Sequence, residues 1–238
     1  MNGEKVWKIE YFDEIASTNE YVKEKRKDRQ NRIAIAYRQS GGKGTKGRSF
    51  SSEAGGVYLS VLTFYENFPA KDAFLIMANA AVAVVKTLES FGFSPVIKWA
   101  NDIFVDGKKI CGILIENTFS GQNVDSSVVG IGLNVNNELP AELLDIATTM
   151  SKAGKKEFDR KQVEKRLIEE LKKTHTVDEY LQYVGFMGKK ATLVCGETAK
   201  KVTLVSVDKQ GGLTVLTERG EEERFVAAEI SIRLGETL

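Results

Sequence analysis

Apolar and polar positions change along this chain in short blocks, and most of the blocks have the spacing of β-strands. Strands rich in β-branched and aromatic residues are expected at residues 6–15, 32–39, 57–65, 96–105, 108–116 and 126–135. Residues 70–91 instead carry a dense, alanine-rich apolar pattern with helical spacing, which predicts a buried helix. The pattern therefore predicts an α+β fold with helices packed on a mixed β-sheet.

Two further helices are indicated by their N-terminal caps. Ser17 or Thr18 can cap a polar helix that runs to about Asp28. Asp159 can cap a longer helix, and the apolar side chains that share one face of it are Val163, Leu167 and Leu171.

The pattern changes beyond Gly185, where short strands alternate with turn residues. These strands are expected at residues 190–195, 201–207, 213–216, 223–226 and 230–234. A block of about 50 residues with this pattern suits a small SH3-like β-barrel. We therefore predict two domains, residues 1–185 and residues 186–238, which a chain of 238 residues is long enough to form.

Composition limits the classes of function. The formal net charge is +1, so no global field draws in nucleic acid or an anionic membrane. Cys111 and Cys195 lie far apart, and neither a disulfide framework nor a metal-ligand spacing is expected. The single histidine, His175, rules out a His-rich metal site and is expected on the surface. No signal peptide and no uninterrupted apolar run of membrane-spanning length is visible, so a cytoplasmic protein without a membrane partner is expected.

Residues 40–56 form a loop rich in glycine and serine that carries Lys43, Lys46 and Arg48. Backbone amides and cations in such a loop can bind an anion such as phosphate. The loop is not a P-loop, because Arg48 stands where the lysine should be and a strand follows in place of a helix. From the residues alone, a mobile surface loop is the better explanation of this composition.

Residues 98–116 read KWANDIFVDGKKICGILIE and place Lys98, Asn101 and Asp102 close together in a strand-like run. Alternation puts Lys98 and Asp102 on one face. A cation, an amide and a carboxylate suit a nucleotide–magnesium site. A polar edge strand is an equally good explanation of these residues.

Lys109 follows an Asp-Gly turn, where it can reach a ligand carboxylate or simply be an exposed hairpin lysine. Gly112 interrupts the apolar run after it, which suggests close approach by a ligand or another backbone. Gly130 and Gly132 lie on one face of the strand at residues 126–135, where they leave either a groove for a flat ligand or a tightly packed core.

Together these segments resemble the biotin–protein ligase family. Its motifs are a GRGRxGR loop, a KWPND strand followed by K-x-x-G-I-L-x-E, a G-x-G-x-N strand and a Ser-Thr-Asn start near the N-terminus. The counterparts occur here in the same order, at residues 17–19, 39–48, 98–102, 109–116 and 130–134. The resemblance implies a class II aminoacyl-tRNA synthetase-like catalytic domain at residues 1–185, followed by an SH3-like β-domain.

The resemblance also implies a two-step reaction. Biotin and ATP, with Mg²⁺, give biotinyl-5′-AMP, and biotin is then transferred to a lysine of an acceptor. The expected acceptor is the biotin carboxyl carrier domain of acetyl-CoA carboxylase or a related carboxylase. No DNA-binding helix-turn-helix pattern precedes residue 6, so no DNA partner is expected. A monomer and a homodimer both remain open.

Residue roles follow from the resemblance position by position. The residues expected to bind biotin are Ser17, Thr18, Asn19, Gln39, Gly42, Lys43, Lys109, Gly112 and Gly132. Those expected to serve ATP are Lys98, Asn101, Asp102, Asn134 and Arg48. Catalysis would rest on Lys109, Arg48 and Lys43, and Asp102 would hold Mg²⁺.

Three residues depart from the family's motifs. Lys43 and Thr45 stand at the first two arginines of the loop motif, and Ala100 stands at the proline of KWPND. Lysine keeps the charge but loses the bidentate fork of arginine, and threonine loses the charge. Two alternatives therefore stay open beside a biotin ligase. One is a lipoate or octanoyl ligase, and the other is a degenerate paralogue that binds biotin without transferring it.

Overall fold

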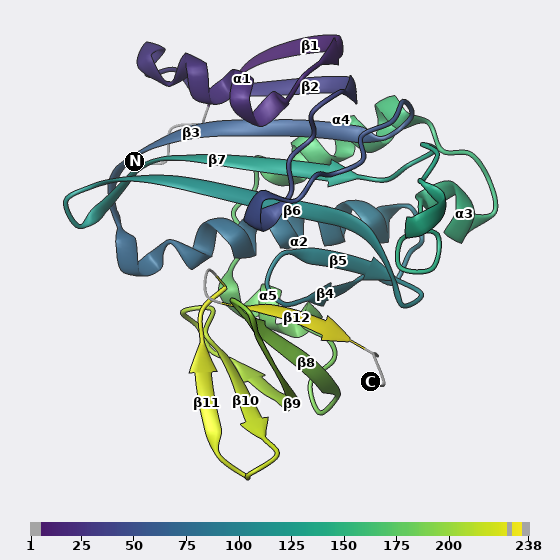
Figure 1. The fold of residues 1–238 in the computed structure, drawn as a ribbon. Coiled ribbons are helices and arrows are strands. Elements are labelled where there is room, and N and C mark those ends of the chain that lie inside the picture. Colours follow the sequence, from purple (N-terminus) through teal and green to yellow (C-terminus); the bar gives the residue numbers. More distant parts are fainter. Residues whose placement is uncertain (1–5, 228–229, 235–238) are drawn as a thin grey trace.

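The computed structural model describes residues 6–227 and 230–234 (Figure 1). Residues 1–5, 228–229 and 235–238, which include the outer ends of both predicted domains, lie outside the described residues.

The first part of the chain forms a mixed seven-stranded sheet, as the strand pattern predicts. β1 and β2 pair in parallel, and every other neighbouring pair is antiparallel. In order across the sheet, the strands are β1 (Lys8–Ile15), β2 (Arg32–Gln39), β3 (Val57–Pro69), β7 (Asn123–Leu133), β6 (Lys108–Ser120), β5 (Asp102–Val105) and β4 (Val96–Lys98).

Helices cover both faces of this sheet. α1 (Thr18–Glu24), which continues as a 3-10 turn to Asp28, packs on β2, β3 and β7, with Val22 in a small buried cluster. The other face is covered by α2 (Phe74–Ser90), α4 (Arg160–Leu171) and α5 (Val177–Tyr183), and a short α3 (Met150–Gly154) follows the β7 end. Ser17 and Asp159 cap α1 and α4 as predicted.

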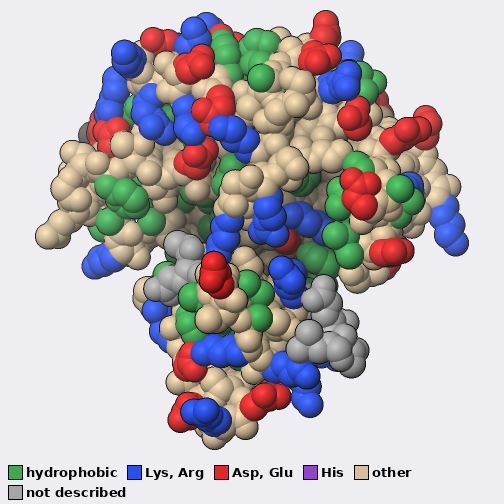
Figure 2. Space-filling model, in the orientation of Figure 1, with side chains coloured by type: hydrophobic (Ala, Val, Ile, Leu, Met, Phe, Trp, Pro, Cys, Tyr) green, Lys and Arg blue, Asp and Glu red, His purple; other side chains and the backbone are tan. Residues whose placement is uncertain are grey.

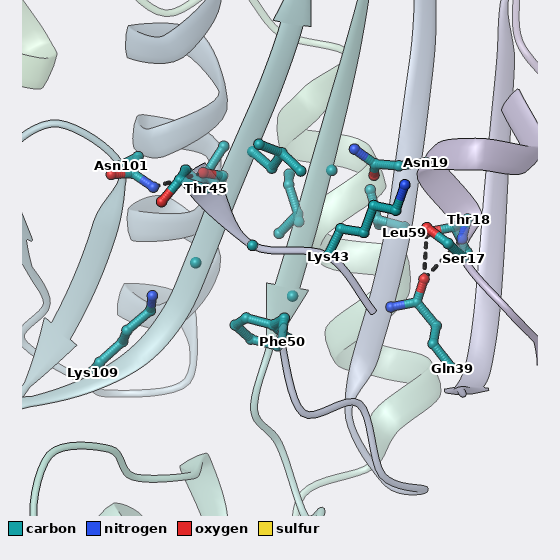
Figure 3. Close-up of a pocket in the computed structure, with 17 residues that line it drawn as sticks. Ser17, Thr18, Asn19, Gln39, Lys43, Thr45, Phe50, Leu59, Asn101 and Lys109 are labelled. Carbon is teal, nitrogen blue, oxygen red and sulfur yellow. Dashed lines mark hydrogen bonds between the residues drawn. The ribbon is translucent and has the colours of Figure 1, made fainter. Parts of the chain in front are cut away.

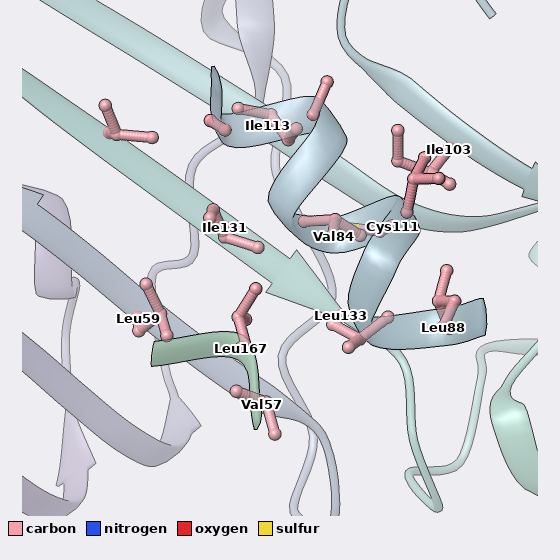
Figure 4. Close-up of a cluster of buried hydrophobic side chains, with 14 of the residues drawn as sticks. Val57, Leu59, Val84, Leu88, Ile103, Cys111, Ile113, Ile131, Leu133 and Leu167 are labelled. Atoms are coloured by element: carbon pink, nitrogen blue, oxygen red, sulfur yellow. The ribbon is translucent and has the colours of Figure 1, made fainter. Parts of the chain in front are cut away.

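The main core lies between the sheet and α2 (Figure 4). Ile131 and Leu133 of β7 and Ile113 of β6 meet Val84 and Leu88 of the helix. Residues Ala70–Ser90 are by length and composition apolar enough to cross a membrane, although Lys71, Asp72, Lys86 and Glu89 interrupt the apolar run. The structure explains the apolarity otherwise, because 56% of the apolar window is buried inside the protein against the sheet, α4 and α5.

The strand predicted at residues 96–105 is two strands. β4 and β5 form a hairpin that turns at Trp99, Ala100 and Asn101. Trp99 and Ala100 are buried in the core of the C-terminal sheet, where the indole Nε1 donates to the Gly211 carbonyl oxygen at 3.0 Å. Burial of a large aromatic side chain with its polar atom satisfied favours this turn over a straight strand.

The C-terminal part of the chain is a five-stranded antiparallel sheet, which confirms the predicted fold class. In order across the sheet, its strands are β11 (Glu222–Phe225), β10 (Leu213–Thr217), β9 (Thr198–Val207), β8 (Lys190–Cys195) and β12 (Ser231–Leu234). Its apolar side chains form a separate buried cluster that Trp99 and Ala100 join. A division into two domains after Gly185 stays a prediction.

His175 is buried, so its predicted surface position is wrong. The ring Nε2 lies 3.2 Å from the Glu170 carbonyl oxygen and 3.5 Å from that residue's carboxylate, because the chain turns tightly between α4 and α5. Cys111 is buried and Cys195 is exposed, and both are free thiols, as predicted.

The core makes a first prediction. Ile131→Ala removes a fully packed side chain and should lower the free energy of unfolding by about 2–5 kcal/mol. Val205→Ala, at a side chain that is 39% exposed in β9, is the control and should cost less than about 1 kcal/mol. Urea titration followed by far-UV circular dichroism compares the two, and equal costs would contradict the packing described.

Candidate functional site

A row of paired residues crosses the α1 side of the sheet. Lys98 pairs with Asp102, Asp102 with Gly112, Gly112 with Gly132, and Gly132 with Tyr58. Side chains of directly paired residues lie on the same face. The row therefore has charge at its β4 end and a floor without side chains in the middle.

The glycines let other parts of the chain lie directly on this floor. A Cβ atom on Gly132 would come within 2.4 Å of the Phe50 ring, and one on Gly130 within 2.2 Å of Asn19 Oδ1. The Phe50 ring also lies near Gly112, where a Cβ atom would be 3.1 Å away. The glycines are thus needed for close approach, as the sequence predicts for Gly112.

A pocket lies over the floor, with an empty volume of about 450 Å³ that includes its open mouth (Figure 3). Nine of the residues predicted for the site line it, namely Ser17, Thr18, Asn19, Gln39, Lys43, Asn101, Lys109, Gly112 and Gly132. The lining residues that sequence reasoning did not assign to the site are Gly44, Thr45, Phe50, Leu59, Ile113, Leu114, Gly130 and Ile131.

One side of the pocket is a network of uncharged polar groups. The Gln39 Oε1 atom accepts from the Thr18 amide at 2.8 Å and from its hydroxyl at 3.0 Å. The Thr18 hydroxyl lies 2.7 Å from that of Ser60, and Gln39 Nε2 donates to the Ser52 hydroxyl at 3.0 Å. Such a buried network holds donors and acceptors in fixed directions and suits a neutral polar ligand group.

The opposite side of the pocket is charged (Figure 3). Lys109 Nζ forms an ion pair with Asp102 Oδ1 at 2.7 Å, and both side chains are partly buried. Lys98 lies nearby, with Nζ over the Phe104 ring. Burial lowers the pKa of Lys98, the Asp102 carboxylate opposes that shift, and Lys109 and Arg48 add to it.

Figure 2 shows lysine and arginine side chains gathered around the hollow between the two sheets. Lys109 and Arg48 each lie close enough to Lys98 to act on it electrostatically. One carboxylate, Asp102, accompanies these cations. This local field suits a ligand with more than one negative charge.

Five of the predicted site residues do not line the pocket: Gly42, Arg48, Lys98, Asp102 and Asn134. Arg48 is turned to Thr45, donating from Nε to its carbonyl oxygen at 3.2 Å and from Nη2 to its hydroxyl at 3.0 Å. Asn134 is buried and donates to the Thr148 carbonyl oxygen at 3.1 Å, so it fixes the segment after β7.

Gly42 fixes the shape of the loop. A Cβ atom there would lie 2.4 Å from the Phe50 carbonyl oxygen. The Phe50 amide donates a hydrogen bond to the Gly42 carbonyl oxygen at 2.9 Å. Lys43 crosses toward α1 and pairs with Glu20 at 2.7 Å. These contacts hold the loop against the pocket, and its binding of an anion stays a prediction.

Within residues 6–227 and 230–234, no group of three or more His, Cys, Asp or Glu side chains is placed to hold a metal ion. A Mg²⁺ ion that arrives with nucleotide phosphates needs only one or two protein carboxylates. Asp102 is the carboxylate at the charged side of the pocket, and it is engaged by Lys109.

Phe50 and Ser60 are the residues that sequence reasoning missed most clearly. Phe50 stands at the end of the Gly-rich loop, and its ring packs on Gly132 and lies 5.8 Å from Lys109 Nζ. Ser60 is a fully buried hydroxyl in an apolar strand, directly paired with Gly130. A buried polar residue opposite a glycine is a usable signal only once the strand register is known.

Comparison with known proteins identifies relatives. Residues 11–134 match the model of the biotin/lipoate A/B protein ligase family. The chain is 36% identical over 157 residues to the bifunctional ligase/repressor BirA of Bacillus subtilis, covering 63% of this chain and 48% of that protein. It is 33% identical over 105 residues to a biotin–[acetyl-CoA-carboxylase] ligase of Paracoccus denitrificans, covering 42% of this chain and 43% of that one.

A solved structure gives a likeness over the full length. A biotin protein ligase from Aquifex aeolicus in complex with biotin and ATP is 30% identical, with a TM-score of 0.75. The match covers 96% of this chain and 99% of that chain. By contrast, the match covers only 48% of the length of the two Bacillus BirA proteins, so this chain spans about half the length of those relatives.

The glycine floor makes a second prediction. Gly132→Val places a side chain where the Phe50 ring lies and should displace the loop, so that amides of residues 42–50 exchange faster with deuterium. Hydrogen-exchange mass spectrometry without added ligand measures this. Val205→Ala, at an exposed side chain of β9 in the C-terminal sheet, is the control and should leave exchange in the loop unchanged. Unchanged loop exchange in Gly132→Val would contradict the close packing described.

Proposed function

We propose that this chain, which belongs to the biotin protein ligases of the biotin/lipoate A/B protein ligase family, activates biotin with ATP. The activated biotin is then transferred to a lysine of an acceptor protein. The observation that carries the proposal is the two-sided pocket on the glycine floor. Biotin has a neutral polar ring at one end and a carboxylate at the other. The Thr18–Gln39 network suits the ring, and Lys109 suits the carboxylate.

The first step joins two anions. A biotin carboxylate oxygen attacks the α-phosphorus of ATP, the bond to the bridging oxygen breaks, and pyrophosphate leaves. Cations placed where the charges meet are the main requirement, and no protein nucleophile is needed. Lys109, Lys98 and Arg48 provide those cations at the charged side of the pocket.

In the second step an unprotonated lysine amine of the acceptor attacks the biotinyl carbonyl carbon, and AMP leaves with the phosphate oxygen. The glycine floor and the loop over it would keep water from the mixed anhydride until the acceptor arrives. Lys43 and Gly42 belong to that loop, and Phe50 covers the floor at its end.

The proposed roles follow the two sides of the pocket. Ser17, Thr18, Asn19 and Gln39 would bind the biotin ring over Gly112 and Gly132, and Lys109 would bind the carboxylate. Lys98, Asn101 and Arg48 would serve the nucleotide, and Asn134 would act through the segment that it fixes. Asp102 would contribute to Mg²⁺ brought with ATP, which releases Lys109 for biotin.

The acceptor that we propose is a biotin carboxyl carrier domain of acetyl-CoA carboxylase or a related carboxylase. The name of the Paracoccus relative supports this choice. A cytoplasmic location and the lack of a DNA partner belong to the same proposal. A lipoate or octanoyl ligase is the second candidate, since the family model includes lipoate ligases.

The proposed activity predicts that this protein, biotin and MgATP raise the mass of a carrier domain by one biotin. Intact-mass spectrometry measures the product, and reactions without ATP or with the acceptor lysine replaced are the controls. Lipoic and octanoic acids are run in parallel and should give no product. Labelling by either of those acids but not by biotin would favour the second candidate, and biotin binding without labelling would indicate a degenerate paralogue.

Lys109→Ala should slow pyrophosphate release in the presence of biotin and ATP by about 100-fold or more, because it removes a charge where the two anions meet. Lys108→Ala is the matched control. The neighbouring Lys108 donates to the Leu144 carbonyl oxygen at 2.7 Å and does not line the pocket, so this variant should act like the wild type. Wild-type adenylation by a folded Lys109→Ala protein would exclude the proposed role.

A further inference from the structure

Glu20 has an unexpected position at the start of α1. Ser17 and Glu20 have the spacing of a capping box, in which the third helical residue bonds back to the cap. The same spacing at α5 forms the complete box, with the Thr176 amide donating to Glu179 Oε2 at 2.7 Å. At α1 only the forward bond forms, from the Glu20 amide to Ser17 Oγ at 3.5 Å. The Glu20 carboxylate points elsewhere.

That carboxylate binds the Gly-rich loop. Glu20 Oε1 accepts from Lys43 Nζ at 2.7 Å and from Lys23 Nζ at 3.0 Å. Hydrogen bonds from Lys43 and then Lys23 lower the pKa of Glu20, so the carboxylate is charged at neutral pH. The Glu20 side chain therefore contacts Lys43 of the loop and does not complete the capping box of α1.

Lys23 anchors the far side of this contact. Its Nζ donates to Glu116 Oε1 at 2.8 Å, and the other oxygen of Glu116 accepts from Asn19 Nδ2 at 3.2 Å. Asn19 lines the pocket beside the glycine floor. The carboxylate that receives Lys43 is therefore tied to the pocket wall.

The other end of the loop is tied to the same wall. Ser52 Oγ donates to the Phe50 carbonyl oxygen at 3.1 Å and accepts from Gln39 Nε2, which belongs to the network around Thr18. Residues 43–52 are thus bound at both ends to α1 and its neighbours. Of the two attachments, the one at Lys43 is exposed to solvent, since the side chain of Lys43 is 51% exposed and that of Glu20 is 38% exposed.

We propose that Glu20 is a positioning residue, which holds Lys43 and with it the Gly-rich loop across the pocket so that a bound acyl-adenylate is retained. This inference rests on the proposed function. Glu20 does not itself line the pocket, and it acts through Lys43. Loss of its charge lets the loop open more often and the adenylate leave before an acceptor lysine reaches it.

An exposed ion pair shifts such an equilibrium only modestly. Glu20→Gln should therefore speed loop opening by about two- to fivefold, while the rate of adenylate formation stays near that of the wild type. Glu24→Gln, at an exposed carboxylate on the same helix, makes the same charge change and is the matched control.

Limited trypsin digestion of the substrate-free protein tests the inference directly. Mass spectrometry follows cleavage after Lys46 and Arg48, since neither is bonded to Glu20. Cleavage should be two- to fivefold faster in Glu20→Gln and unchanged in Glu24→Gln, with the melting temperatures of both variants and the wild type alike. Equal cleavage in Glu20→Gln and wild type, or equally fast cleavage in Glu24→Gln, overturns the inference.

A second measurement connects the loop with the chemistry. Biotinyl-5′-AMP released into solution is quantified after one turnover without acceptor, and Glu20→Gln should release it two- to fivefold faster than Glu24→Gln. Wild-type retention of the adenylate by Glu20→Gln overturns the inference and leaves the proposed function intact. Failure of the wild type to form any adenylate contradicts the proposed function, while the digestion result still reports on Glu20.

Discussion

The bare floor formed by Gly112, Gly130 and Gly132 is the constraint on which the site depends. Each glycine in a strand weakens it by roughly 0.5–1 kcal/mol relative to alanine. The opposite face of the same two strands carries Ile113, Ile131 and Leu133, which pack against α2 and secure the sheet. Because one face supplies the packing, the other face can lack side chains at these three positions and accept α1, the Phe50 ring and a ligand at close range.

The charged end of the row follows from the same register. Pairing across β4, β5 and β6 places Lys98 and Asp102 on the face that carries Gly112. Lys109 then meets Asp102 at 2.7 Å, so the partly buried cation and carboxylate stabilise each other when no other ion is near. A ligand carboxylate can replace Asp102 as the partner of Lys109, and a cation brought with a nucleotide can replace Lys109 as the partner of Asp102. Exchange of partners therefore costs less than burying a lone charge would.

The sequence predicts the strands of the large sheet and the polar residues of the pocket because both leave local patterns. It fails where the outcome depends on distant partners. Residues 96–105 form a hairpin because Trp99 is buried in a sheet more than 90 residues later in the chain, at the Gly211 carbonyl. His175 is buried by a turn between two helices, and no local polarity signal reveals this. Glu20 has the spacing of a helix cap, and only the position of Lys43 shows its other contact.

The two departures in the Gly-rich loop change how the loop is held. A lysine presents a compact point charge, and at residue 43 one carboxylate oxygen of Glu20 is sufficient to bind it, whereas a planar arginine fork favours two acceptor atoms. Threonine at residue 45 has lost a charge but gained an acceptor, and its hydroxyl and carbonyl oxygens both receive Arg48. An arginine side chain at that position has no acceptor to offer. The loop therefore keeps two cationic contacts, each matched to the residue that stands there, so the lost charge at residue 45 does not by itself indicate a lost activity.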